Sequence, residues 1–275
     1  MRRFAALFLL LAATAAAAQT RNPDELVTAA ALGETARVAG LLDSGFDVNG
    51  RNSVGRTALL AAAAEGRADT VRLLLARRAD LGARDRAGNT ALHAAAKEGH
   101  AGVVVLLAEA GADLGVRNDA GETPLFVAAE YGRLDAARAL LERRADPNAR
   151  AAHGETPLFG AAMHGDPAVV ALLLDRGAEV NLANRGGEAA LFWAAGAGQL
   201  AAARVLIERG AFVNAQDANG NTALIAAADG GYADVVRLLL ERKADPALRN
   251  REGLAPADIA RARGYDEVVK LLAGK

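Results

Sequence analysis

Hydrophobic and polar residues between positions 90 and 121 predict two short helices and a turn. Residues 91–97 are mostly alanine and other strong helix formers, Thr90 precedes them as a capping residue, and Gly99 follows them. Residues 104–107 then place valine and leucine on one face, as an amphipathic helix does. Residues 111–121 are rich in glycine, asparagine and aspartate, which tolerate turn geometry. We therefore expect a helix, a tight turn, a second helix and a β-turn.

The same pattern recurs every 33 residues, in eight copies without an insertion. One glycine recurs at Gly33, Gly66, Gly99, Gly132, Gly165, Gly198, Gly231 and Gly264. One leucine recurs at Leu41, Leu74, Leu107, Leu140, Leu173, Leu206, Leu239 and Leu272. One alanine recurs at Ala29, Ala62, Ala95, Ala128, Ala161, Ala194, Ala227 and Ala260. A fixed period of this length indicates a solenoid of stacked units.

Each copy resembles the ankyrin repeat, a 33-residue unit with the signature T-P-L-H-x-A. The matching segments are Thr90-Ala91-Leu92-His93-Ala94-Ala95, Thr123-Pro124-Leu125-Phe126-Val127-Ala128 and Thr156-Pro157-Leu158-Phe159-Gly160-Ala161. The resemblance covers residues 22–275. It implies an all-α solenoid of stacked helix-turn-helix units joined by short β-turn or hairpin loops.

The repeat register divides the chain into a first copy, six internal copies and a last copy. The first copy takes residues 19–51 and the last takes residues 250–275. The internal copies take residues 52–84, 85–117, 118–150, 151–183, 184–216 and 217–249. The first and last copies depart from the signature, and residues 261–270 are rich in charge. Terminal repeats need a polar outer face, so we interpret both copies as caps.

Residues 1–18 have the layout of a secretory signal peptide. Arg2 and Arg3 precede the apolar segment 4–11, and small residues follow as far as Ala18. This predicts cleavage after Ala18 and a periplasmic or secreted protein; an uncleaved membrane anchor is the alternative. The apolar segment is short for a bilayer span, and no later segment of sufficient length lacks charge, so we expect no membrane span in the mature chain.

Composition excludes several kinds of chemistry. The chain has no cysteine, which rules out disulfides, thiolate metal sites and a cysteine nucleophile. Its formal net charge is −1, whereas proteins that coat nucleic acid are strongly basic. We therefore expect no nucleic-acid partner. Ser44 and Ser53 have no histidine base at a suggestive spacing and the chain has no phosphate-loop motif, so we also expect no enzymatic activity. We further expect no cofactor and a monomer.

Two of the four histidines are expected to have no catalytic role. His93 stands at the signature position, where the resemblance implies that it ties its helix start to neighbouring turns. His100 begins a second helix and is expected to be solvated.

The other two histidines, His153 and His164, belong to one copy. With Asp166 or Glu130 nearby they suggest a metal-dependent or small-ligand role as an alternative function. No cysteine or further histidine completes a set of four ligands, which favours the absence of a metal site.

The resemblance implies recognition of other macromolecules, usually proteins, through the concave face and the turn tips. A secreted effector directed at a host is a further hypothesis. A row of arginines precedes the turn tips: Arg51, Arg84, Arg117, Arg150 and Arg249. Guanidinium groups suit an acidic partner because their donors bind both oxygens of a carboxylate. The alternative is pairing with the acidic neighbours Asp85, Glu122, Glu155 and Glu252.

Larger side chains at Tyr131, Met163 and His164 give a second set of candidate partner contacts, since tyrosine and methionine are enriched in interface cores. Ordinary variation at exposed positions is the alternative. Phe212 stands where most other copies have an acid, and it is a candidate anchor for a partner or for a neighbouring copy. Trp193 is expected to pack into the space that Gly160 leaves in the preceding copy.

Overall fold

A computed structural model describes residues 22–274 of the protein. The predicted signal peptide, residues 1–18, lies outside these residues. The described part contains sixteen helices and no β-strand, which confirms the predicted all-α repeat fold. No helix within it is both long and apolar enough to cross a lipid bilayer.

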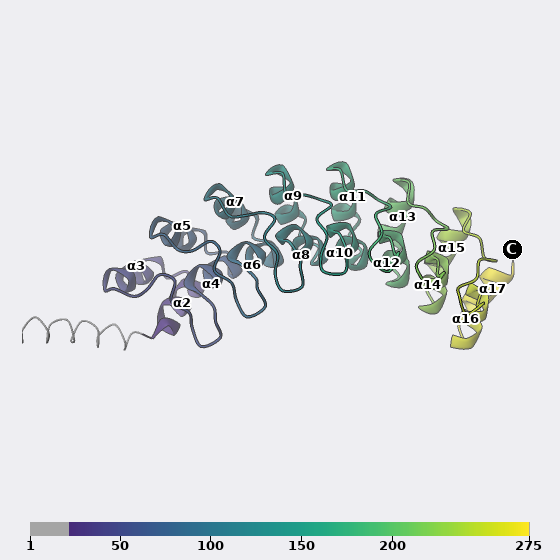
Figure 1. The fold of residues 1–275 in the computed structure, drawn as a ribbon, viewed down its shortest axis with the longest axis horizontal. Coiled ribbons are helices and arrows are strands. Elements are labelled where there is room, and N and C mark those ends of the chain that lie inside the picture. The colour runs from purple at the N-terminus through teal and green to yellow at the C-terminus, as the bar shows by residue number, and fades with distance from the viewer. Residues whose placement is uncertain (1–21, 275) are drawn as a thin grey trace, which may run out of the picture. The chain divides into compact units, whose positions relative to one another are not determined.

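The chain forms two compact units, one ending at Asp113 and one beginning at Leu114. In each, the chain alternates between a first and a second helix of a repeat (Figure 1). The first unit contains α2 (Pro23–Leu32), α3 (Thr35–Asp43), α4 (Ala58–Ala64), α5 (Ala68–Ala76), α6 (Ala91–Glu98) and α7 (Ala101–Glu109).

The second unit continues the alternation, and successive first helices pack side by side, as do successive second helices (Figure 1). Its first helices are α8 (Pro124–Glu130), α10 (Pro157–His164), α12 (Ala190–Gly196), α14 (Ala223–Asp229) and α16 (Pro256–Arg263). Its second helices are α9 (Leu134–Glu142), α11 (Pro167–Asp175), α13 (Leu200–Glu208), α15 (Ala233–Glu241) and α17 (Asp266–Ala273).

The recurring alanine, leucine and glycine each have a structural reason. All eight alanines of the series are 0% exposed, because the first helices approach too closely for a larger side chain. The leucine of the series is buried in every repeat from Leu74 onward and packs the second helices against the first. Each glycine of the series has a positive φ, which glycine adopts without the steric cost that a Cβ brings.

In several repeats the residue after this glycine reaches back to the preceding repeat. The His100 ring lies over Gly66, and its Nε2 is 3.0 Å from the carbonyl oxygen of Ala64. In the second unit Gln199 lies over Gly165 and donates to the carbonyl oxygen of Met163. His100 is therefore part-buried and bonded, and the expectation that it is solvated was wrong.

The turn loops are short and closed by backbone hydrogen bonds instead of strands. In the second unit the tips are also joined to one another: the N–H of Ala152 donates to Ala120, and that of Arg185 to His153. The pattern continues from Ala218 to Gly186 and from Arg251 to Asn219. The tips therefore form a continuous edge beside the first helices.

Candidate functional site on the turn-tip face

The first helices and turn tips of the second unit share one surface, which we call the turn-tip face. Two cavities on it draw their walls from both kinds of element. The aromatic cavity lies over α8, α10 and α12, and the C-terminal cavity lies over α12, α14 and α16.

The aromatic cavity has a volume of about 330 Å³. Its apolar wall consists of Phe126, Phe159, Met163 and Trp193. The two phenylalanines are buried, whereas Met163 is 42% exposed. Its floor therefore belongs to the hydrophobic core, and its rim is open to a ligand.

Acidic side chains surround this apolar wall. Asp119, Glu122, Glu130 and Glu155 line the cavity, and no lysine or arginine is among its described lining residues. Glu122 accepts from Asn118 Nδ2 at 2.8 Å, and Glu155 accepts from the backbone N–H of His153 at 3.1 Å. Both of these donors are neutral groups.

Trp193 contributes a buried polar atom with no bonding partner. Its Nε1 has no hydrogen-bond partner within the described chain and is shielded from solvent. An unsatisfied buried donor costs about 1–3 kcal/mol. Gly160 lines the same cavity, and a Cβ there would approach the backbone of Glu130 to 3.0 Å, so α8 and α10 leave no room for a side chain. Trp193 lines the same cavity as Gly160, but the space at Gly160 itself is taken by the backbone of Glu130.

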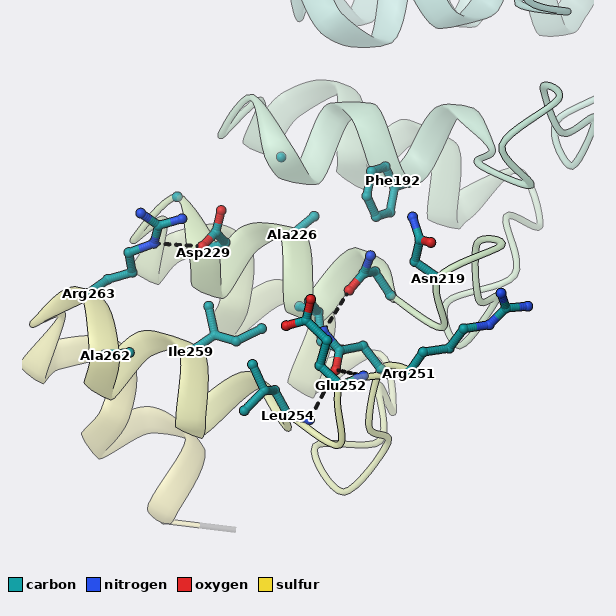
Figure 2. A pocket seen from close by; sticks show the side chains of 15 residues that line it. Phe192, Asn219, Ala226, Asp229, Arg251, Glu252, Leu254, Ile259, Ala262 and Arg263 are labelled. Atoms are coloured by element: carbon teal, nitrogen blue, oxygen red, sulfur yellow. Dashed lines mark hydrogen bonds and ion pairs between the residues drawn. The ribbon is translucent and has the colours of Figure 1, made fainter.

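The C-terminal cavity is larger, about 760 Å³, and its walls are of mixed chemistry. Figure 2 shows Arg263 and Asp229 pointing toward each other, and Nε of the arginine lies 2.8 Å from Oδ1 of the aspartate. That aspartate holds the pKa of Arg263 above its usual range. Arg251 and Glu252 also line this cavity, so its acids and bases are balanced.

The two cavities occupy equivalent places in the solenoid, two repeats apart. Eight lining residues of one have a counterpart in the other whose number is higher by 66. The pairs, aromatic cavity first, are Phe126 and Phe192, Glu130 and Gly196, His153 and Asn219, Glu155 and Asn221, Phe159 and Ile225, Gly160 and Ala226, Met163 and Asp229, and Trp193 and Ile259. At these positions the aromatic cavity thus carries aromatic and acidic side chains, whereas the C-terminal cavity carries aliphatic or neutral residues at most of them.

Four of the five arginines in the predicted row donate to backbone carbonyl oxygens. Arg51 donates to Gly55 and Arg84, Arg117 to Gly121 and Arg150, and Arg150 to Gly154 and Ala183, in every case to carbonyl oxygens. Arg249 donates to the Gly253 carbonyl and to Asp258, the latter at 3.1 Å. These arginines therefore join a turn to the next repeat. Their contact with an acidic partner stays a prediction.

The other predicted contact residues do not form one group. Met163 lies on the rim of the aromatic cavity. Tyr131 is 39% exposed at the end of α8 and is not part of the described lining of either cavity. Phe212 is 68% exposed in the turn after α13, beside Phe192 and Leu191. Of these three residues, Met163 alone belongs to the described lining of the aromatic or the C-terminal cavity.

The two histidines suggested as metal ligands face different surroundings. His153 lines the aromatic cavity, whereas the ring of His164 lies against Gly132 of the preceding repeat. Among the described residues no group of three or more histidine, aspartate or glutamate side chains is arranged to hold a metal ion. His93 was expected to have a structural role. It is buried, and its Nδ1 accepts from the backbone N–H of Thr90, the capping residue of its own helix.

Sequence reasoning missed most of the aromatic cavity. Asp119, Phe126 and Phe159 were not predicted as contact residues. A signal was present: three successive copies carry phenylalanine at the same register, Phe126, Phe159 and Phe192, and Trp193 directly follows the last of them. Their meeting depends on three repeats packing together, which no single segment shows.

Comparison with protein families gives one consistent result. Models of ankyrin repeats match residues 5–85, 26–118, 79–151 and 150–217, and a second ankyrin-repeat model matches residues 206–260. Comparison with curated proteins finds no match.

Proposed function

The chain belongs to the ankyrin-repeat family, and on that premise we propose that it is an exported, non-catalytic adaptor that binds another protein through the turn-tip face of its second unit. Ankyrin repeats generally mediate protein–protein interaction. The observation that carries the choice of surface is the pair of equivalent cavities on this face. Stable interfaces combine an apolar centre with a polar rim, and the aromatic cavity has both.

The non-catalytic part of the proposal is supported by the side chains that line the two cavities. Neither lining has a cysteine, a serine or a lysine to act as nucleophile, within the residues described. His153 is the one histidine in either described lining, and its ring has no second histidine in the same cavity.

Export is supported by sequence alone, through the basic, apolar and small-residue order of residues 1–18. Expression of the full chain with a reporter fused after Lys275 tests it. A mature product that begins at Gln19 and appears in the exported fraction is expected. A full-length product retained in the cytosol would refute export and would leave the binding proposal unaffected.

Binding is tested by capture with matched variants of the mature chain, residues 19–275. The bait is compared with Met163→Arg, which alters the turn-tip face, and with Arg138→Asp, which alters the exposed surface of α9. A protein retained by the first bait and by Arg138→Asp, but lost with Met163→Arg, supports the proposal. A protein lost only with Arg138→Asp would place the binding surface on the second helices instead.

A further inference from the structure

We propose that the C-terminal cavity receives an extended segment of the partner protein that carries an apolar side chain together with one acidic and one basic side chain. This inference rests on the proposed function and specifies the chemistry that the turn-tip face recognises. It follows from an exposed apolar residue, from the room above α14 and from two opposite charges that have no partner within the described residues.

Leu254 is an apolar residue at a position that is polar in all six internal copies. It stands just before the N-cap of α16, lines the cavity and is 37% exposed. The residues at the same register are Arg56, Asn89, Glu122, Glu155, Glu188 and Asn221. The repeat therefore does not require a hydrophobic side chain here. Together with Phe192 and Ile259, Leu254 gives this cavity an apolar wall that a ligand can cover.

A small residue on α14 leaves room beside this wall. Trp193, Ala226 and Ile259 share one register on α12, α14 and α16, so only a methyl group stands on the middle helix. Figure 2 shows Ala226 between Phe192 on one side and Ile259 and Leu254 on the other. The cavity volume of about 760 Å³ lies within the range of ligand pockets and leaves room for a segment of several residues. An apolar side chain can therefore be seated on Ala226 while its neighbours contact the rim.

Two charges at the rim lack an intramolecular counter-charge. Arg263 and Asp229 neutralise each other, with Nε of the arginine 2.8 Å from Oδ1 of the aspartate. Arg251 and Glu252 are bonded through their backbone N–H groups, and their side chains have no hydrogen bond or ion pair within the described residues. The corresponding pairs in the preceding tips of the second unit are Asp119-Ala120, Ala152-His153, Arg185-Gly186 and Ala218-Asn219. Neighbouring charges of opposite sign are thus particular to the last tip.

The directions of these two side chains define the charges that the occupant must carry. Figure 2 shows the carboxylate of Glu252 toward Ile259 and the guanidinium of Arg251 extending away on the side of Asn219. A segment that crosses the cavity between them places a basic group at Glu252 and an acidic group at Arg251, whereas a segment with charges of one sign is repelled by one of the two. In an extended chain, side chains two residues apart point to the same face. The apolar and charged residues of the partner therefore alternate with outward-facing ones.

The isoleucines of the chain report directly on this cavity. There are three, Ile207, Ile225 and Ile259; the last two line the cavity, whereas Ile207 lies on α13. Methyl NMR of the full mature protein, labelled at isoleucine, is recorded while a capped five-residue peptide is added. The peptide carries glutamate, leucine and lysine at its first, third and fifth positions, with serine between them. We expect the Ile225 and Ile259 signals to shift in a saturable way and the Ile207 signal to stay in place.

Further peptides define the occupant. One has the glutamate and the lysine exchanged, one has two glutamates and one has two lysines. We expect one of the two mixed-charge orders to bind at least about threefold more tightly than the other three peptides, because it alone pairs both rim charges. The preferred order is then repeated with alanine in place of leucine, and this peptide should bind about tenfold more weakly because it buries less apolar surface.

Matched variants of the protein locate the effect. Arg251→Glu with Glu252→Arg exchanges the two rim charges at constant net charge, and it is expected to reverse which mixed-charge order binds more tightly. Leu254→Asn introduces the residue of the preceding repeat and should lower the affinity about fivefold. Arg138→Ala, on the exposed surface of α9, is the control and should leave the affinity unchanged. Circular dichroism confirms that each variant is folded.

Four results would overturn the inference: no shift of the Ile225 and Ile259 signals with any peptide, tightest binding of a peptide with charges of one sign, equal binding of the leucine and alanine peptides, or a preferred order that the charge exchange does not reverse. A partner captured through Met163 together with any of these results would leave the proposed function standing. Binding of the mixed-charge peptide without a captured partner would instead refute the proposed function and retain this site.

Discussion

The aromatic cavity and the C-terminal cavity are formed at equivalent places in the repeat array, two repeats apart. Both lie between first helices and turn tips, and eight of their lining positions correspond at an offset of two repeats. At these positions Trp193 is replaced by Ile259, Glu155 by Asn221 and Met163 by Asp229. The comparison shows that the repeat supplies the cavity, while a few substitutions decide its chemistry.

Core residues at positions that the two cavities share should have the largest effect on the free energy of unfolding. Phe159 and Ile225 correspond and are 4% and 3% exposed. Phe159→Ala is expected to lower the free energy of unfolding by about 3–5 kcal/mol and Ile225→Ala by about 2–5 kcal/mol, since both leave a void in the core. Urea unfolding followed by circular dichroism measures this. Phe212→Ala, at a position 68% exposed, is the control and should change it by less than about 0.5 kcal/mol. Equal effects at Phe159 and Phe212 would contradict the described core.

Residues that differ between the two cavities should have the largest effect on binding of the partner. Trp193→Ile with Glu155→Asn gives the aromatic cavity the residues of its counterpart. We expect the affinity for the captured partner to fall by at least about tenfold, because an aromatic contact and one charge are lost. Calorimetry measures the change, since the variant has no tryptophan. Trp193→Phe keeps an aromatic ring and removes the unsatisfied N–H, so its loss should be smaller. Unchanged affinity in the double variant would show that the two cavities do not differ in this respect.

The smallest expected effect comes from a substitution in the last repeat, residues 250–275. Asp258 takes the register of Phe126 and Phe192, and the backbone N–H of Ala255, helped by Arg249 and Arg261, lowers its pKa. A lowered pKa contributes stability that is present above the ordinary aspartate pKa and is lost as pH falls through the pKa of the folded state. Asp258→Asn should therefore lower the thermal midpoint slightly at neutral pH, and the difference from wild type should shrink in acid.

That prediction is checked by thermal unfolding of both proteins between neutral and acidic pH. Glu252→Gln, at an exposed neighbouring turn, serves as control. A constant difference across the pH range would contradict the role assigned to the charge of Asp258.

The fold was predictable because each recurring residue meets a structural requirement that is the same in every repeat. The alanine series reflects close helix packing, and the glycine series reflects a positive φ, so both appear in the sequence at a fixed period. The sequence also indicated Met163 as unusual. The cavities were not predictable, because Phe126, Phe159 and Trp193 come from three repeats and meet only after packing. The backbone contacts of Arg117 and Arg150 were missed for the same reason, since their acceptors lie in the next repeat.

The most direct test of the account is site-specific crosslinking from the turn-tip face. The chain has no cysteine, so Met163→Cys provides one thiol at the rim of the aromatic cavity, and Arg138→Cys provides one on α9. Each is labelled with a photoreactive maleimide and irradiated in the native exported fraction. The account predicts one protein that is crosslinked through position 163 and is absent when the label is at position 138. Crosslinking of a partner only through position 138, or through neither position, would contradict it.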